Sequence, residues 1–299
     1  MQMCSLHING QVIPTQETFD VINPATGEVF AKCSLATEEH VDMAVKAARN
    51  AFPAWSARSD AERSALCLEL AQTLEENMPE MMELVTQENG KPLVGLNNVG
   101  SGMEVGGSIA WIQATANTAL PVDVIQEDAQ YSIEVHRKPL GVVGSITPWN
   151  WPLLIAIWHV IPALKTGNTV VLKPSEYTPV ATARFVELAN HILPPGVLNV
   201  VTGFGQVGAA MSAHPDINKI VFTGSTHTGR KIMAASAGNL KRLTLELGGN
   251  DAGIVLPDID VKALAPRIFA ACFHNNGQTC AALKRLYVHE NIFDELAKE

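Results

Sequence analysis

The sequence has fewer basic than acidic residues. Its 21 lysines and arginines stand against 30 acidic residues, which gives a formal net charge of −9, and they form no long block. Proteins that bind nucleic acid or anionic membranes usually carry a basic patch. We therefore expect neither nucleic acid nor a membrane as a partner, and a small-molecule substrate fits the composition better.

Long apolar runs are lacking as well. The most apolar stretch, 151–164, is interrupted by Pro152, His159 and Pro162, and the chain does not open with a basic segment followed by an apolar one. A membrane-spanning helix needs about 20 apolar residues in succession, and a secretory leader needs a basic-then-apolar start. We therefore predict no membrane span and no leader.

Cysteine is scarce, and its spacing fits no known framework. The five cysteines are odd in number, scattered, and contain no Cys-x-x-Cys pair. Neither a disulfide scaffold nor a metal site is predicted, and a reducing compartment, the cytoplasm, is favoured. The five positions are Cys4, Cys33, Cys67, Cys272 and Cys280.

The first half of the chain predicts short strands followed by helices. An Asn9-Gly10 pair indicates a β-hairpin, and residues 23–27 indicate a turn. The spacing of apolar residues then predicts helices capped by Thr37 and by Asp60, with Pro79 opening a third. A length of 299 residues with 47% hydrophobic content leaves room for about two domains.

The middle and second half of the chain predict a hairpin followed by alternating strands and helices. Residues 122–136 read as an extended hairpin that often seeks another sheet edge. From Leu140 the pattern alternates strand and helix, and the strands are short apolar runs without alternation, which is typical of a doubly wound, Rossmann-type parallel sheet. One predicted helix covers 153–164, and another is capped by Thr178 with Pro179 at its first position. The predicted strands are 142–146, 169–172, 198–201, 219–222 and 243–247.

Polar residues follow these strands at the sheet edge where such folds bind ligands. Asn150 lies between two tryptophans and two prolines, so a rigid loop would present its amide to an oxyanion. The run 203–208 fits G-x-G-x-x-G, but no acidic residue follows at the expected distance, and close helix–strand packing explains it equally well. Lys173 and Glu176 are by default a solvated ion pair.

Glu246 and Cys280 each leave two interpretations open. Glu246 lies in an otherwise apolar strand, where it is either a paired structural carboxylate or a general base. Cys280 follows an apolar helical pattern and a turn at Asn275-Asn276-Gly277. A thiol on such a loop is either an activated nucleophile or a small buried hydrophobe.

Together these stretches resemble the aldehyde dehydrogenase superfamily. The motifs T-P-W-N-W-P, K-P-S-E, F-T-G-S-T, E-L-G-G and N-x-G-Q-x-C occur in the family's order, and the N-terminal N-P-A-T-G-E matches as well. The resemblance implies a dinucleotide-binding domain over 1–247 with an oligomerisation hairpin at 120–138, and the beginning of a catalytic domain at 248–299. It also implies a homo-oligomer in full-length form.

The resemblance assigns chemistry to three residues. Cys280 would be the nucleophile that adds to an aldehyde, Asn150 the donor to the resulting oxyanion, and Glu246 the general base that activates water to hydrolyse the thioester. Family chains continue well past this nucleophile. We therefore expect this chain to be truncated, to bind nucleotide weakly and to turn over aldehyde poorly or not at all.

The resemblance also implies a nicotinamide cofactor. Lys173 and Glu176 would hold the adenosine ribose, and Ser225 with nearby N–H groups at a helix start would face the pyrophosphate. NAD is expected rather than NADP, because the Glu176 carboxylate would repel a 2′-phosphate. The cofactor positions are Ile146, Thr147, Pro148, Trp149, Lys173, Ser175, Glu176, Gly205, Phe222, Thr223, Gly224, Ser225, Thr228, Leu247 and Gly248.

Two competing functions stay open at this point. Acyl transfer to coenzyme A is disfavoured, because relatives with that activity generally lack the carboxylate found here as Glu246. A truncated chain that serves only in nucleotide binding or assembly is the second alternative. Asn250 departs from the lysine that the family usually has after E-L-G-G, and it lies outside the predicted catalytic carboxylate.

Overall fold

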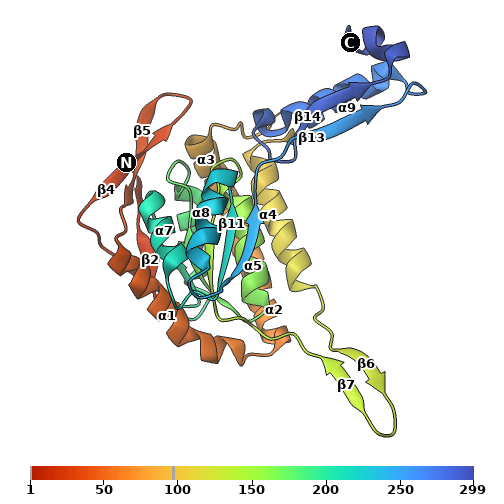
Figure 1. The fold of residues 1–299 in the computed structure, drawn as a ribbon. Helices are drawn as coiled ribbons and strands as arrows, with labels where there is room; N and C mark the ends of the chain where they lie inside the picture. Colours follow the sequence, from red (N-terminus) through yellow and green to blue (C-terminus); the bar gives the residue numbers. More distant parts are fainter. Residues whose placement is uncertain (1, 96–97) are drawn as a thin grey trace.

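The computed structural model describes residues 2–95 and 98–299, and its centre is a seven-stranded sheet (Figure 1). Five strands run parallel in the order β12-β11-β8-β9-β10, and the β2–β3 hairpin extends the sheet antiparallel to β10. Chain order reverses between β8 and β11, as it does in doubly wound folds. The strands are β8 Val142–Ile146, β9 Thr169–Lys173, β10 Leu198–Val200, β11 Lys219–Thr223, β12 Arg242–Glu246, β2 Leu6–Ile8 and β3 Gln11–Ile13.

The predicted strands are confirmed with shifts of one residue at their ends. Every residue of β8, β9 and β10 is buried, which explains why these segments are apolar without alternation. The order of the strands places the carboxyl ends of β8 and β11 beside each other. In such sheets ligands bind at this edge, outside the point where the strand order reverses.

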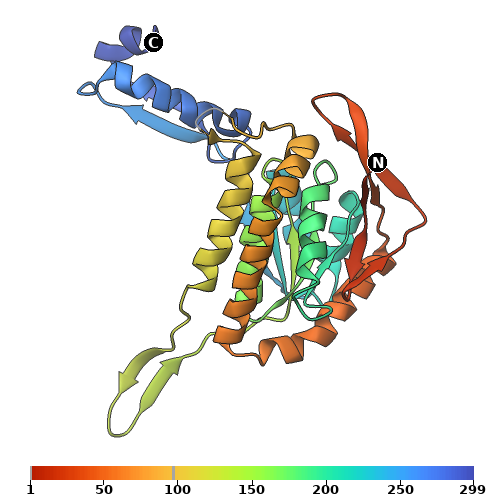
Figure 2. The same ribbon diagram turned by 180° about the vertical axis from the view of Figure 1, so that it is seen from behind.

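Helices cover both faces of the sheet, so the Rossmann-type fold is confirmed. Figure 1 shows α7 and α8 in front of the sheet, and Figure 2 shows α2 and α4 in front of the opposite face. Each face has its own core of buried side chains. The helices are α1 Glu38–Ser56, α2 Asp60–Glu76, α3 Met78–Asn89, α4 Ser101–Ala116, α5 Pro152–Lys165, α6 Val180–Ala189, α7 Gly205–Ala213 and α8 Thr226–Ser236.

Two of the predicted helix caps are wrong by one residue. The hydroxyl of Ser59 accepts the N–H of Glu62 at 3.2 Å, so Ser59 caps α2 and Asp60 is its first residue. Pro179 is the N-cap residue of α6, and the hydroxyl of Thr178 instead donates to the Trp149 carbonyl at 3.3 Å. In both cases two adjacent residues suit a helix start, and tertiary contacts decide between them.

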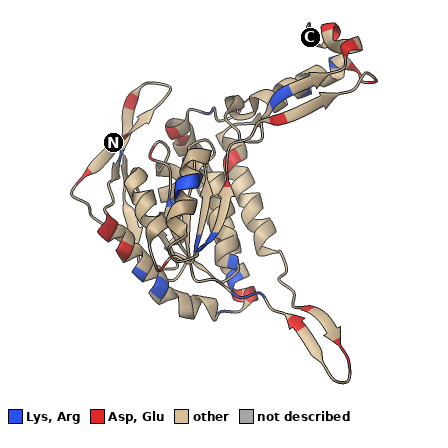
Figure 3. Ribbon diagram, viewed as in Figure 1, with Lys and Arg blue, Asp and Glu red and all other residues tan. Residues whose placement is uncertain are grey.

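Small sheets flank the central domain. The Asn9-Gly10 hairpin and the turn at 23–27 are confirmed, with Asn9 and Gly10 at φ 56° and 73°. The predicted 122–136 hairpin is also present and projects from the body (Figure 1). Figure 3 shows the acidic residues of α1 at its N-terminal end, with its basic residues following them. The flanking strands are β1 Gln2–Cys4, β4 Thr18–Asn23, β5 Glu28–Ser34, β6 Asp123–Glu127 and β7 Ser132–Val135.

The C-terminal segment forms a separate small layer that projects from the body (Figures 1 and 2). Two parallel strands pack with one helix around Val255, Val261 and Ile292. Of the described helices, none is both long and apolar enough to cross a bilayer. The elements are β13 Asp251–Val255, α9 Val261–Phe273, the 3₁₀ turn η2 His274–Gly277, β14 Leu283–Val288, η3 Glu290–Ile292 and α10 Phe293–Leu296.

Candidate active site

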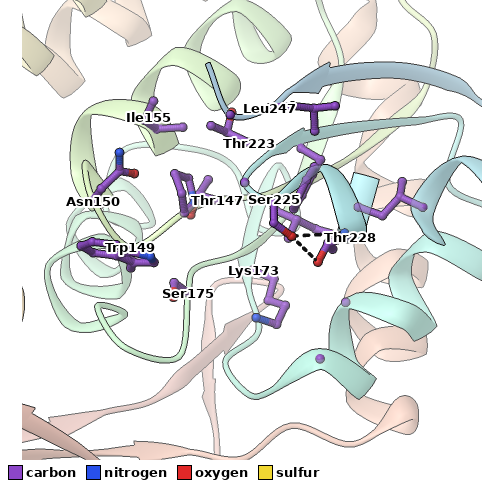
Figure 4. A pocket seen from close by; sticks show the side chains of 18 of the residues that line it. Thr147, Trp149, Asn150, Ile155, Lys173, Ser175, Thr223, Ser225, Thr228 and Leu247 are labelled. Carbon is purple, nitrogen blue, oxygen red and sulfur yellow. Dashed lines mark hydrogen bonds between the residues drawn. The ribbon is translucent and has the colours of Figure 1, made fainter. Parts of the chain in front are cut away.

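A cavity of about 1050 Å³ opens at the carboxyl ends of β8, β9 and β11. Every predicted cofactor position lines it, and so do Asn150 and Cys280. Figure 4 shows Thr147, Trp149 and Asn150 on one side and Ser225 with Thr228 opposite them. The structure therefore brings together residues that are far apart in the sequence. Glu246 is the exception among the predicted site residues, since it is not part of the described cavity lining.

One side of the cavity is suited to a negatively charged group. Ser225 is the N-cap residue of α8, and its hydroxyl accepts the N–H of Thr228 at 3.2 Å. The first-turn N–H groups of a helix have no acceptor within the helix, and the helix dipole adds partial positive charge there. Such a helix start binds phosphate oxygens well.

Lys173 of the Lys173–Glu176 pair is buried, whereas Glu176 is partly exposed. Lys173 is only 4% exposed, and its ammonium donates to the Pro174 carbonyl at 3.0 Å and lies 3.8 Å from a Glu176 carboxylate oxygen. Burial lowers the pKa of Lys173, and the charge of Glu176 acts in the opposite direction. The interpretation as an ordinary surface ion pair is therefore wrong. Both side chains face the cavity with polar atoms that suit ribose hydroxyls.

The glycines of the run 203–208 have two roles: one permits close packing of strand and helix, and another leaves the backbone open to the cavity. A Cβ on Gly203 would lie 2.7 Å from Val207, so this glycine permits close strand–helix packing. A Cβ on Gly205 would meet nothing within 4 Å, and Gly205 lines the cavity. The same open space lies beside Gly248. These glycines leave the backbone accessible to a bound group.

One buried polar atom in the cavity wall has no partner among the described residues. The Thr147 side chain is 4% exposed, and its hydroxyl makes no hydrogen bond. Buried hydroxyls nearly always have a partner, so this atom indicates a missing ligand or water. Together with the open glycines and the α8 start, it fits a nucleotide cofactor in this cavity.

The loop that carries Cys280 reverses through three left-handed residues. After α9 ends at Phe273, Asn275, Asn276 and Gly277 have φ values of 52°, 58° and 75°. Asparagine and glycine are the residues that enter this region at least cost. The predicted turn is thus confirmed. Gly249 lies against it, because a Cβ there would collide with the Cys280 carbonyl.

The cysteines differ in access to solvent. Cys280 is exposed, Cys272 is half-buried and Cys4, Cys33 and Cys67 are buried. The interpretation of Cys280 as a small buried hydrophobe is therefore wrong. Burial raises the pKa of the Cys67 thiol to about 11 and that of Cys33 further. Only Cys280 among the five lines the cavity.

Hydrogen bonds join the Asn150 loop to the Cys280 loop. The Asn150 side-chain amide donates to the Gln278 carbonyl at 2.7 Å, and the Asn275 amide donates to the Asn150 carbonyl at 2.9 Å. The indole N–H of Trp151 donates to the Thr279 hydroxyl at 3.1 Å. These bonds hold the Asn150 amide against the loop that carries Cys280. The sequence indicated Asn275 only as a turn residue, and it contained no signal for the roles of Gln278 and Thr279.

Glu246 is the last residue of β12 and lies beside Thr223 of β11. Its carbonyl accepts the N–H of Gly224 at 2.9 Å. The side chain is exposed, and within the described part of the chain its carboxylate has no ion-pair or hydrogen-bond partner. The interpretation as a paired structural carboxylate is therefore not supported here.

Comparisons with known proteins identify the family that this chain resembles. The sequence pattern described as "Aldehyde dehydrogenase family" matches residues 12–299. Phenylacetaldehyde dehydrogenase of Pseudomonas fluorescens is 42% identical over 97% of this chain and 60% of its own length. The chain thus spans about 60% of the length of such relatives.

Solved structures give the same result. The structure of PnpE in complex with nicotinamide adenine dinucleotide, an enzyme from Pseudomonas sp. WBC-3, is 42% identical and has a TM-score of 0.93 over 100% of this chain and 61% of that one. An NADP-dependent enzyme of E. coli is 34% identical, with a TM-score of 0.94 over 99% of this chain and 62% of that one.

Proposed function

Because the chain belongs to the aldehyde dehydrogenase family, we propose that its protein oxidises an aldehyde to a carboxylic acid with NAD. The observation that supports this most is that Cys280 and Asn150 line the same cavity as the predicted cofactor positions, and that the Asn150 amide is hydrogen-bonded to the loop that carries Cys280. A nucleophile beside a fixed amide donor suits covalent chemistry at a carbonyl carbon.

In this proposal the chain holds the cofactor through groups at the strand ends. Lys173 and Glu176 would contact the adenosine ribose, and Ser225 with the first turn of α8 would face the pyrophosphate. A bound nicotinamide supplies the acceptor for the hydride that the aldehyde loses. The Glu176 carboxylate favours NAD, since it would repel the 2′-phosphate of NADP.

Three residues of the chain carry out the proposed covalent chemistry. The exposed Cys280 thiol gives up its proton to solvent, the thiolate sulfur forms a bond to the aldehyde carbon, and the carbonyl electron pair moves to oxygen. One N–H of the Asn150 amide is used by Gln278, which leaves the second free to donate to that oxygen together with the Cys280 backbone N–H. After oxidation, Glu246 would take a proton from water, whose oxygen bonds to the acyl carbon as the carbon–sulfur bond breaks.

We also propose the division of the chain and its assembly. Residues 1–247 would form the dinucleotide-binding domain and residues 248–299 the beginning of the catalytic domain. The 120–138 hairpin would take part in a homo-oligomer, since Val124 and Ile125 on β6 are 53% and 65% exposed and Ile133 on β7 is 46% exposed. Five free cysteines favour the reducing cytoplasm.

A second candidate is nucleotide binding or assembly without turnover. One observation favours it: Glu246 lies outside the described cavity lining. Hydride transfer depends on geometry, and a small misplacement reduces the rate about 10²-fold.

The two candidates are separated by one experiment. Purified protein is titrated with NAD by calorimetry and then assayed for NADH formation with a panel of small aldehydes. Aldehyde-dependent NADH that disappears in Cys280→Ala supports the first proposal. NAD binding without NADH supports the second, and neither binding nor turnover would contradict both.

A further inference from the structure

A buried ion pair lies directly behind the Asn150 loop. Lys91 follows the end of α3 and is 2% exposed, and Glu104 lies in the first turn of α4 and is fully buried. The Lys91 ammonium is paired with one carboxylate oxygen of Glu104. Neither residue lines the cavity described above. Nothing in the chemistry proposed so far uses them.

Lys91 holds the backbone of Asn150 itself. Its ammonium donates to the Asn150 carbonyl at 3.0 Å and lies 3.9 Å from the centroid of the Trp151 ring. The same carbonyl accepts the Asn275 amide from the Cys280 loop. A charged donor on one side and a loop donor on the other fix the orientation of this peptide group.

Glu104 holds the residues that follow. Its second carboxylate oxygen accepts the N–H groups of Leu153 at 3.0 Å and Leu154 at 3.2 Å, in the first turn of α5. A carboxylate at a helix start satisfies N–H groups that have no partner within the helix. The ion pair thus anchors the chain on both sides of Trp151, from the Asn150 carbonyl to the start of α5.

Stability alone does not explain such a pair. Burying two charges requires removing both from water, and well-packed apolar residues of similar volume are often as stable or more so. An ion pair that also makes directed hydrogen bonds does something that apolar residues do not do, because it fixes a backbone orientation. Here the backbone that it fixes carries the amide beside Cys280.

We propose that Lys91 and Glu104 are positioning residues for the oxyanion donor. They hold the Asn150 backbone so that the side-chain amide keeps its place beside the Cys280 loop. The catalytic part of this inference rests on the proposed aldehyde oxidation. The geometric part does not, since it concerns the position of one amide group within the chain.

The test removes the pair without leaving a buried charge, in the double variant Lys91→Met/Glu104→Gln. The matched control is Lys165→Met, which removes another buried lysine from the far end of α5, where it donates to Asp60 and Ser64 at 2.6 Å. Each variant is made alone and with Asn150→Ala. The kcat for NADH formation is measured for all variants, and the exchange of the Asn150 side-chain amide protons is followed by NMR in those that keep Asn150.

Loss of the pair should lower kcat about 10²-fold, as a small misplacement of a reacting group does, with KM for NAD unchanged. In the Asn150→Ala background the same change should produce no further loss, because the group being positioned is gone. Faster exchange of the Asn150 amide protons is expected in the pair variant and not in Lys165→Met. Glu104→Gln alone serves as the second variant if the double variant does not fold.

Failure of the positioning role can be distinguished from failure of the proposed aldehyde oxidation. If the pair variant lowers kcat by the same factor with Asn150 present and with Asn150→Ala, the positioning role is overturned while aldehyde oxidation stays intact. An equal loss of kcat in Lys165→Met would overturn it as well. If the unmodified protein forms no NADH, the proposed function fails, and amide exchange alone decides the inference. Unchanged exchange of the Asn150 amide in the pair variant would then overturn it.

Discussion

Replacing Asn150 by alanine separates the catalytic contribution of its amide from the structural one. Among the described residues, the amide makes one hydrogen bond, to the Gln278 carbonyl at 2.7 Å, and in the proposed mechanism its second N–H donates to the oxyanion. Asn150→Ala removes both donors. It leaves the Asn150 carbonyl, and hence the bonds from Lys91 and Asn275, in place.

The two contributions differ greatly in size. Loss of one intramolecular hydrogen bond lowers the free energy of unfolding by about 1 kcal/mol, and Asn275, whose amide lies 3.4 Å from the Gln278 carbonyl, replaces part of it. Loss of an oxyanion donor raises the activation free energy by about 2.7–4 kcal/mol, which corresponds to about 10²–10³ in kcat. The variant should therefore melt within a few degrees of the parent and yet oxidise aldehyde at least about 10²-fold more slowly.

The assay measures kcat for NADH formation and the melting temperature on the same samples. Asn275→Gly is the matched control, because glycine keeps the left-handed backbone at φ 52° while removing the donor to the Asn150 carbonyl and the weaker 3.4 Å bond to the Gln278 carbonyl, and it leaves the Asn150 amide in place. It should cost a similar amount of stability and less activity. Equal losses of kcat in the two variants, or a loss below tenfold in Asn150→Ala, would refute the assignment of Asn150 as the oxyanion donor.

Three other results are expected. Cys280→Ala should abolish turnover whereas Cys272→Ala retains it, and iodoacetamide at about pH 8 should label Cys280 first. The kcat/KM for NAD should exceed that for NADP, and Glu176→Gln should narrow the difference by relieving repulsion of the 2′-phosphate; equal efficiencies in the parent would contradict the role of Glu176. Burial raises the pKa of Glu88 from 4.5 to about 8, so between these pH values the folded protein keeps a proton on Glu88 that the unfolded chain has lost. The free energy of unfolding should therefore fall as pH rises from the unfolded pKa through about 8. In urea titrations at several pH values, Glu88→Gln should make this fall smaller.

The sheet was predictable because strands that are buried on both faces consist of short runs of apolar residues. Strands such as Val142–Ile146 and Thr169–Lys173 are fully buried, and only short apolar runs survive there. Their order then places the strand-end motifs together by topology alone. Helix starts are less certain, because at 59–60 and at 178–179 two neighbouring residues compete for the cap.

The partners of the site residues were not predictable in the same way. Lys91 follows a glycine and precedes a proline, a context that indicates only a turn, and Glu104 lies in a glycine-rich stretch. Their pairing depends on how α3 and α4 pack beside the Asn150 loop, which no local pattern encodes. The burial of Lys173 was missed for a related reason, since a Lys-x-x-Glu spacing is the same on a surface and in a wall.

The position of Cys280 depends on tertiary contacts as well as on the turn. Two successive asparagines in the left-handed region cost conformational energy, and asparagine reduces this cost only because its side chain can hydrogen-bond nearby. Here the Asn275 amide bonds to the Asn150 carbonyl, which belongs to the central domain, so part of what holds the turn comes from outside the C-terminal segment. The bonds from Asn150 and Trp151 to residues 278 and 279 have the same origin. It follows that any shift of the C-terminal layer against the sheet disturbs the nucleophile and the oxyanion donor together, and the geometry of the site is a property of how these two parts of the chain pack.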